Sequence, residues 1–558
     1  MRDPRAPHKG DRLLALLLAA ATFLALALTE RSVGFARDEA VYFRAGESYA
    51  AWYEDLFRAA AQGRPLPLGD AAITSRFEIN HEHPALAKTL FGLSHWVFTE
   101  QLNLLSAAAG FRLPAWALSG FLSALLYLMA APLVSRRGGV FAVAAFWLTP
   151  RHFFHGHLAC FDMPVAWAWL LVVYCYWRSL SRPRWALATG LAFGVALALK
   201  HNAWFIPGVL AIHFALAVAK GALRESGLRG LLRALAPFGA MLVLGPLFFY
   251  LHWPYLWHDP WPRFLGYVAF HAQHLNYPWE FFGRLLVEAP FPVGYAFAVT
   301  AVTVPAATLA LMATGTLAEM GRFAATYLFP GARRFASALD GDSLLLLGNA
   351  LASLTLLSMP NVPIFGGVKH WLPSMPFLAI LAARALERVA ATTGALLERR
   401  GERHGPRLAR AAYPALLLLV LGPSAWGVAH NHPYGTSSYN ELAGGAPGAA
   451  TLGMHRQYWS NNVTGVLDWL NRNAPQTARV FLHEVNWESF LAYRKAGMLR
   501  PDLQYANGPE DSETAVYQYM PEFRDTEFQI WNLYGTRAPV AGLYLDETPQ
   551  IVVYQRGR

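Results

Sequence analysis

The chain has 558 residues, of which 55% are hydrophobic and only 15% are charged. Charged residues make up about a quarter of an ordinary soluble domain. The composition therefore argues against a cytosolic globular enzyme or a disordered protein, and two cysteines are too few for a disulfide scaffold. The formal net charge of +10 leaves nucleic-acid binding open until the positions of the charges are considered.

The apolar residues come in eleven blocks near the length that crosses a bilayer. A membrane-spanning helix needs about 20 mostly apolar residues. The first block, 13–29, follows a short basic leader, as in a cleaved signal peptide, but the many later blocks favour a retained anchor. The other blocks are 113–134, 140–155, 160–177, 185–200, 203–219, 235–251, 291–313, 342–358, 371–385 and 411–428.

The connections between these blocks differ in charge from one side of the membrane to the other. If the N-terminus is cytoplasmic, each inside connection has more Lys and Arg than Asp and Glu, and the outside segments together are net acidic. Cytoplasmic loops of membrane proteins carry this basic excess. We therefore expect a cytoplasmic N-terminus and a C-terminus outside. The net charge reflects orientation, and the basic residues show no nucleic-acid motif.

Three outside segments, 30–112, 252–290 and 429–558, are too long to be simple connectors. In the last one, residues 479–483, 540–545 and 551–554 have the pattern of strands, and residues 487–496 that of a helix. The sequence predicts an all-α membrane module over residues 1–428, with additional helices beside the membrane in its outside loops. A small α/β domain over residues 429–558 follows it.

Acidic residues lie at the outer ends of the predicted spans. Asp38 and Glu39 follow the first span, and a helix starting there places Tyr42 one turn later. Asp162 opens the fourth block, just before Pro164. Acids in a first helical turn also suit the helix dipole and capping. An ionisable residue at membrane depth nevertheless indicates a functional site, so Asp38, Glu39 and Asp162 are the catalytic candidates.

Basic residues lie at the same outer ends. Lys200 ends the fifth block, Lys369 and His370 precede the tenth, and Lys88 lies in the first outside loop. A lysine at a span end can extend its ammonium to the membrane surface. These lysines lie on the side with fewer cations, however, which favours an anionic partner such as a lipid phosphate.

Histidines are abundant in the outside segments. Such clusters can hold zinc, but the chain has no HExxH motif and no paired-cysteine spacing. Glu82 and His83 are the candidate ligands for a divalent metal, and nothing else in the sequence requires a cofactor.

Several ordered motifs together resemble a known family. They are an Asp-Glu pair after the first span (Asp38-Glu39, with Tyr42), a His-Pro in the first loop (His83-Pro84), an Arg-x-Pro before the second span (Arg112, Pro114), an Asp that opens the fourth span (Asp162), a Gly-rich span ending in Lys (Gly190, Gly194, Lys200) and a Gly-Val-Lys-His-Trp-Leu-Pro stretch (Gly367 to Pro373). Residues 12–430 resemble the GT-C superfamily of integral-membrane glycosyltransferases, in particular the bacterial branch of protein O-mannosyltransferases and lipid A aminoarabinose transferases.

The resemblance implies a role for several of these residues. Asp38 matches the general base that acts on the acceptor, Asp162 a second acid of the same cavity, and Lys200 a basic residue that holds the phosphate of a polyprenyl-phosphate sugar. The aminoarabinose transferases have Arg where this chain has Val41, and Lys where it has His83. Both departures favour the mannosyltransferase-like pattern.

We therefore hypothesise an inverting transfer of a sugar from a polyprenyl-phosphate carrier to a protein hydroxyl or an envelope glycolipid, at the periplasmic face of the bacterial inner membrane. Asp38 would deprotonate the acceptor while Lys200 and Lys369 neutralise the leaving phosphate. The further candidates for substrate binding are Tyr42, His83, Lys88 and His370.

Two alternatives remain open at this point. One is a non-enzymatic lipid or polysaccharide transporter, whose site would lie near mid-membrane, although the centres of the spans carry almost no charge. The other is a ligase that moves a whole glycan from a pyrophosphate carrier, which would require more cations at the phosphate site.

Overall fold

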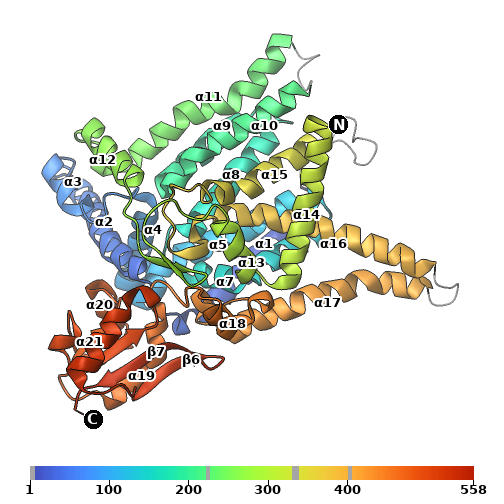
Figure 1. The fold of residues 1–558 in the computed structure, drawn as a ribbon. Coiled ribbons are helices and arrows are strands. Elements are labelled where there is room, and N and C mark those ends of the chain that lie inside the picture. The colour runs from blue at the N-terminus through green and yellow to red at the C-terminus, as the bar shows by residue number, and fades with distance from the viewer. Residues whose placement is uncertain (1–4, 6, 221–226, 330–338, 400–404, 558) are drawn as a thin grey trace.

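The structure, a computed structural model, describes residues 5, 7–220, 227–329, 339–399 and 405–557. Most of these residues are helical (Figure 1). The helices up to residue 272 are α1 (Lys9–Thr29), α2 (Arg37–Ala61), α3 (Asp70–Phe77), α4 (Leu86–His95), α5 (Ala107–Leu133), α6 (Arg136–Trp147), α7 (Pro150–His157), α8 (Asp162–Ser179), α9 (Trp185–Leu199), α10 (Ile206–Ala219), α11 (Gly227–Leu251) and α12 (Pro260–Ala272). A hairpin of β1 (Trp279–Phe281) and β2 (Arg284–Leu286) then leads to α13 (Tyr295–Thr303), α14 (Ala306–Phe323), α15 (Gly341–Leu356), α16 (Met375–Glu398) and α17 (Gly405–Asn431).

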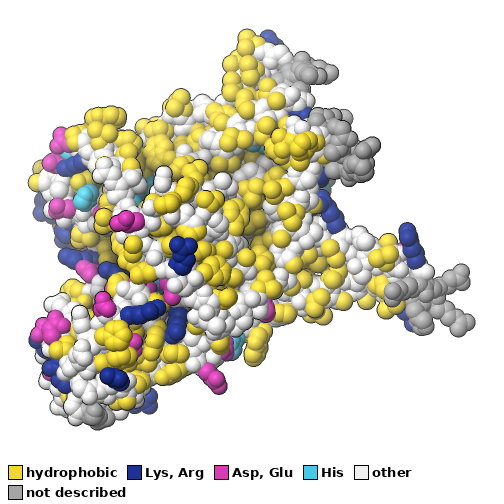
Figure 2. Space-filling model, viewed as in Figure 1, with side chains coloured by type: hydrophobic (Ala, Val, Ile, Leu, Met, Phe, Trp, Pro, Cys, Tyr) yellow, Lys and Arg dark blue, Asp and Glu magenta, His cyan; other side chains and the backbone are white. Residues whose placement is uncertain are grey.

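The helical part is that of a multi-pass membrane protein. Among the described residues, five helical stretches are long and apolar enough to cross a membrane: 9–32, 107–133, 201–219, 227–251 and 405–431. Helices α7 and α8 meet the same criteria together, but they bend by 102° where they join. Hydrophobic side chains cover much of this part in Figure 2, whereas charged ones gather near α2 and α3, on the C-terminal domain and at the helix ends on the right.

All eleven predicted blocks lie on helices, but two of them are not continuous spans. Block 140–155 divides at Thr149, because Pro150 has no amide hydrogen and disfavours a helical residue before it; Thr149 is extended and α7 begins at Pro150. Block 291–313 divides in the same way before Pro305, between α13 and α14. The prediction of an unbroken span is wrong at both places.

The first outside loop contains the expected additional helices, α2, α3 and α4. Helix α2 crosses α4 where Gly46 faces Gly92, and a Cβ atom on Gly92 would overlap the Gly46 carbonyl oxygen. Only glycine permits this approach. The crossing fixes Asp38, at the start of α2, relative to Lys88 on α4.

The C-terminal segment forms the expected small α/β domain. It contains α18 (Gly445–Thr451), α19 (Thr464–Asn473), α20 (Trp487–Lys495) and α21 (Arg524–Tyr534), and the strands β3 (Arg479–Leu482), β4 (Gln504–Tyr505), β5 (Thr514–Gln518), β6 (Ala541–Leu545) and β7 (Thr548–Gln555). The sheet order is β4-β3-β5-β7-β6, with β4, β3 and β5 parallel and β7 antiparallel to both its neighbours. The sequence predicted β3, β6, β7 and α20. It did not predict β5, which is buried at every position and so lacks the alternation of a half-exposed strand.

This domain packs directly against α2 (Figure 1). Three ion pairs join them: Arg37–Glu484 at 2.6 Å, Arg44–Glu488 at 2.9 Å and Lys495–Glu47 at 3.2 Å. One hydrophobic core runs without interruption from α1 to β7. The start of α2 is therefore held between the helical module and the C-terminal domain.

Candidate active site

Asp38 lies where three distant segments of the chain meet. Its Oδ2 atom is 3.4 Å from Nζ of Lys369, in the turn Gly367–His370 before α16, and accepts a 3.0 Å hydrogen bond from the indole Nε1 of Trp459. The Asp38 side chain is 37% exposed, so a substrate can reach the carboxylate. This is the carboxylate that can exchange a proton with an acceptor.

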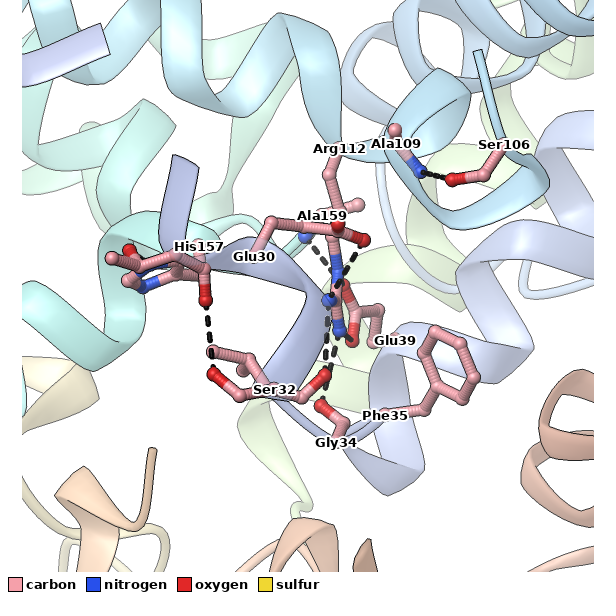
Figure 3. A network of polar contacts seen from close by, with 12 residues as sticks. Glu30, Ser32, Gly34, Phe35, Glu39, Ser106, Ala109, Arg112, His157 and Ala159 are labelled. Carbon is pink, nitrogen blue, oxygen red and sulfur yellow. Dashed lines mark hydrogen bonds and ion pairs between the residues drawn. The ribbon is translucent and has the colours of Figure 1, made fainter. Parts of the chain in front are cut away.

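Glu39, the next residue, is placed very differently (Figure 3). Its carboxylate is fully buried, and Arg112 donates to both of its oxygens at 2.8 Å through Nε and Nη2. The amide of Ala159 donates a further hydrogen bond at 2.8 Å. Glu39 therefore anchors α2 to α5 and to the connection between α7 and α8, and a proton-transfer role is not favoured by this geometry.

Asp162 and Lys200 form a second buried ion pair. Lys200 Nζ is 2.6 Å from Oδ1 of Asp162, and the two side chains are almost inaccessible to solvent. The first turn of α8 supplies the acid, and the residue that ends α9 supplies the lysine. Lys200 thus points inward, and the alternative in which its ammonium extends to the membrane surface does not apply.

Tyr42 lies between the two acid–lysine pairs. Its ring stacks on Phe161, next to Asp162, at a centroid distance of 4.1 Å. Burial, followed by the nearby Asp38 carboxylate, raises the pKa of the Tyr42 hydroxyl well above its ordinary value, and Asp162 acts in the same direction. Tyr42 therefore stays protonated and can donate a hydrogen bond to a substrate.

Lys88 is buried and its ammonium is already engaged. It donates to the carbonyl oxygens of Asn80 (2.5 Å) and His83 (3.0 Å) and to Oδ1 of Asn80 (3.1 Å). An ammonium has three donors, so none is left for a phosphate. Burial lowers the pKa of Lys88 to about 7. The contacts favour a role in shaping the loop 80–83 over direct substrate binding.

Three histidines gather beside this loop. The ligand atoms of His83, His201 and His271 all lie within 4.8 Å of one another. Burial lowers the pKa of His83 well below its ordinary value and that of His271 to about 4, so both rings are neutral, as a metal ligand must be. The buried Nδ1 of His83 has no hydrogen-bond partner in the described structure. This set fits a divalent ion such as zinc. The Glu82 carboxylate instead accepts from Asn80.

His370 lies in the same turn as Lys369. Its ring packs edge-on against Phe365 at 4.6 Å, and its Nε2 is buried without a partner among the described residues. The structure thus brings Asp38 into contact with Lys369 and Asp162 into contact with Lys200. Tyr42 lies near enough to both acids to feel their charge, and Glu39 lies in an anchoring pair.

Two residues of this region were not singled out from the sequence. Trp459 belongs to the C-terminal segment, from which no site residue was predicted, and it adopts a left-handed backbone (φ 72°) that is uncommon for a bulky residue. Arg151 lies on α7, beside the Gly367 turn. An arginine inside the apolar block 140–155 was the available signal for it.

Several of these residues lie in a segment of the chain that matches a known protein family. Residues 85–257 match a family model described as dolichyl-phosphate-mannose-protein mannosyltransferase. The match confirms the resemblance to the GT-C glycosyltransferases and includes Lys88, Arg112, Asp162 and Lys200.

No curated protein sequence matches the chain. Among solved structures, ArnT from Cupriavidus metallidurans bound to undecaprenyl phosphate is 15% identical over 98% of both chains, with a TM-score of 0.46. The archaeal oligosaccharyltransferase AglB from Archaeoglobus fulgidus, in complex with an inhibitory peptide and a dolichol-phosphate, is 13% identical. That match covers 91% of this chain and 69% of the AglB chain, with a TM-score of 0.46.

Proposed function

We propose that the protein transfers a sugar from a polyprenyl-phosphate carrier to a hydroxyl of a protein or an envelope glycolipid, with Asp38 as the general base. The observation that carries the proposal is the arrangement around Asp38: an accessible carboxylate 3.4 Å from the Lys369 ammonium, next to a second, buried acid–lysine pair. A base and phosphate-neutralising cations in one place are what this transfer requires.

In the proposed reaction the acceptor oxygen attacks C1 of the sugar. The new C1–O bond forms while the bond from C1 to the phosphate oxygen breaks, and the electron pair stays on the phosphate. Asp38 takes the acceptor proton, and Lys369 and Lys200 stabilise the developing negative charge. A phosphate leaves as a stable anion, so no separate acid is needed, unlike the two-carboxylate chemistry of glycoside hydrolysis.

Trp459 keeps Asp38 in place for this step. Its indole donates to the same oxygen that faces Lys369, and the Lys369 ammonium lies 4.5 Å from the centre of the Trp459 ring. The C-terminal segment, residues 429–558, therefore completes the site and is more than an appended domain.

The proposed setting is the bacterial inner membrane, with a cytoplasmic N-terminus and the site and C-terminal domain in the periplasm. Its support is the distribution of Lys and Arg among the connections. A transporter is the competing class. In this chain Asp38 lies at the start of α2 and Lys369 in the turn before α16, outside the five helical stretches that are long and apolar enough to cross a membrane, whereas Asp162 lies at the bend between α7 and α8.

The test uses purified protein in proteoliposomes, supplied with a panel of polyprenyl-phosphoryl sugars and an envelope extract as acceptor. D38N should lower the transfer rate by about two to four orders of magnitude, which is the usual contribution of a general base. D55N is the matched control, because Asp55 lies on the same helix in an exposed ion pair with Arg76, and it should transfer normally. Full activity of D38N would remove Asp38 from the reaction, and carrier redistribution without sugar transfer would favour a transporter.

A further inference from the structure

Arg151 is a buried cation without a counter-charge. Its side chain is only 2% exposed, and no carboxylate of the described residues lies within ion-pair distance. Its Nε donates to the carbonyl of Ser438 at 3.1 Å, whereas its buried Nη2 has no hydrogen-bond partner in the described structure. The guanidinium lies 4.7 Å from the ring centre of Tyr439 and 5.8 Å from that of Tyr458.

This environment is unfavourable for a charge. A buried ion is normally paired and fully hydrogen-bonded, because the protein interior replaces lost hydration poorly. Contacts with aromatic rings compensate only in part. An anionic ligand would supply the counter-charge that Arg151 lacks among the described residues.

The neighbours of Arg151 belong to the candidate active site. A Cβ atom on Gly367 would lie 3.3 Å from Nη1 of Arg151 and 2.9 Å from the Tyr458 ring, so a glycine is needed where the turn carrying Lys369 meets the guanidinium. Tyr458 directly precedes Trp459, the residue that holds Asp38. Arg151, on α7, thus lies beside the turn that carries Lys369.

The positive and negative charges of the buried and half-buried side chains at the candidate active site do not cancel one another. Arg151, Lys200 and Lys369 are three cations, whereas Asp38 and Asp162 are two carboxylates, and each carboxylate is already paired with a lysine. The five side chains together carry one positive charge in excess, and Arg151 is the cation that is not paired with a carboxylate.

We propose that Arg151 binds a phosphate oxygen of the carrier-linked donor, as the third cation of the site. The inference rests on the proposed function and adds to it a residue and a charge requirement. A sugar joined to a carrier through one phosphate is a phosphodiester with a single negative charge, which balances the set. During transfer the phosphate gains one negative charge while Asp38 gains a proton, so the balance is kept; a diphosphate donor would leave an excess negative charge.

Because Nη2 is screened from solvent, a donor phosphate reaches it only when neighbouring groups move, and the turn Gly367–His370 and Tyr458 are neighbours of the guanidinium. Gly366 and Gly367 both have left-handed backbone conformations, with φ of 62° and 57°. Two consecutive glycines give this turn the freedom that the movement needs.

The test measures binding to the full-length purified protein in detergent, so it does not depend on turnover. The probes are farnesyl methyl phosphate, which is a diester with one negative charge like the donor, farnesol, which lacks the phosphate, and farnesyl diphosphate. The variants are R151Q, whose amide can still donate to Ser438, and R151M, which cannot. R263M is the matched control, because Arg263 also stacks on a tyrosine (Tyr255, 4.4 Å) but lies at another place and pairs with Asp70.

R151Q and R151M should weaken binding of the diester by about ten- to a hundredfold, the usual range for a hydrogen bond to a charged group. Binding of farnesol should not change, and R263M should bind the diester as the unmodified protein does. The unliganded melting temperature of R151Q should equal or exceed that of the unmodified protein, because an unpaired buried charge has been removed.

Two results would overturn the proposal: normal diester binding by R151Q, or a lower melting temperature of R151Q with equal loss of farnesol and diester. Preference of the unmodified protein for the diphosphate over the diester would refute the charge requirement. The outcome is separable from that of the proposed function, since loss of diester binding in R151Q together with normal transfer by D38N would leave the phosphate site standing and remove only the base.

Discussion

The ion pair between Glu39 and Arg112 offers the most exacting test of how the site is built. Glu39 accepts four hydrogen bonds, from Nε and Nη2 of Arg112 and from the amides of Ala159 and Ala36. Arg112 in turn donates to the carbonyls of residues 33 and 34. Since both side chains are almost completely buried, removing Arg112 leaves Glu39 as an unpaired charge in the interior, and removing Glu39 leaves Arg112 with only the Glu30 carboxylate, 3.6 Å from its Nη1.

The expected size of the effect follows from this burial. Breaking a buried pair by removing one partner costs about 3–5 kcal/mol in the free energy of unfolding, so E39L and R112M should each lose that much. Replacing both by apolar residues removes the stranded charge. The double variant loses mainly the two bonds to carbonyls and the two bonds from amides, at about 1 kcal/mol each, so the coupling energy between the two sites should reach about 2 kcal/mol or more.

The assay is unfolding by a denaturing detergent in mixed micelles, applied to both single variants and the double variant. The matched cycle uses Glu54 and Arg58, an exposed pair one turn apart on the same helix α2, for which a coupling below about 1 kcal/mol is expected. A coupling for Glu39 and Arg112 no larger than that of the exposed pair would refute the reasoning that this pair anchors α2.

Two further predictions concern the groups around Asp38 and the first loop. W459F removes the indole donor from the Asp38 carboxylate, so the transfer rate should fall about tenfold or more while the Michaelis constant for the donor stays unchanged; a changed Michaelis constant at full rate would contradict a role in holding the base. Burial lowers the pKa of Lys88 to about 7, whereas an unfolded chain has it near about 10.4. At pH values between these two pKa values, the unfolded chain therefore binds more protons than the folded protein. The free energy of unfolding should rise with pH from about 7 to about 10. Melting temperatures compared with K88M measure this, and an equal pH dependence in both proteins would show that the Lys88 pKa is not lowered.

Much of the fold follows from local sequence patterns. The apolar blocks coincide with helices because a run of apolar residues of that length is stable only when buried in lipid or in a protein core. Strands β3, β6 and β7 were predictable because their side chains alternate or bear β-branched residues. Strand β5 was not, since a strand buried on both faces loses its alternation.

The site was predictable by residue type but not by role. Asp38 and Glu39 are adjacent acids at the start of one helix, and nothing in their order shows that one is accessible and the other is enclosed by Arg112. The difference arises because successive residues of a helix point about 100° apart, so one faces the domain junction and the other faces α5. Only the packing of α2 against α5 decides which acid remains accessible.

The amino-acid sequence by itself indicated the multi-pass membrane class and the ordered motifs, of which those from Arg112 to Lys200 lie in the segment 85–257 that matches a mannosyltransferase family model. The tertiary structure decided which distant side chains contact one another at the candidate active site. Asp38 meets a lysine 331 residues away and a tryptophan 421 residues away, and among the described residues Arg151 has no carboxylate within ion-pair distance. Local patterns tell which face of a helix is buried. They do not tell which distant side chain lies opposite, because that depends on how the helices pack and where the C-terminal domain lies.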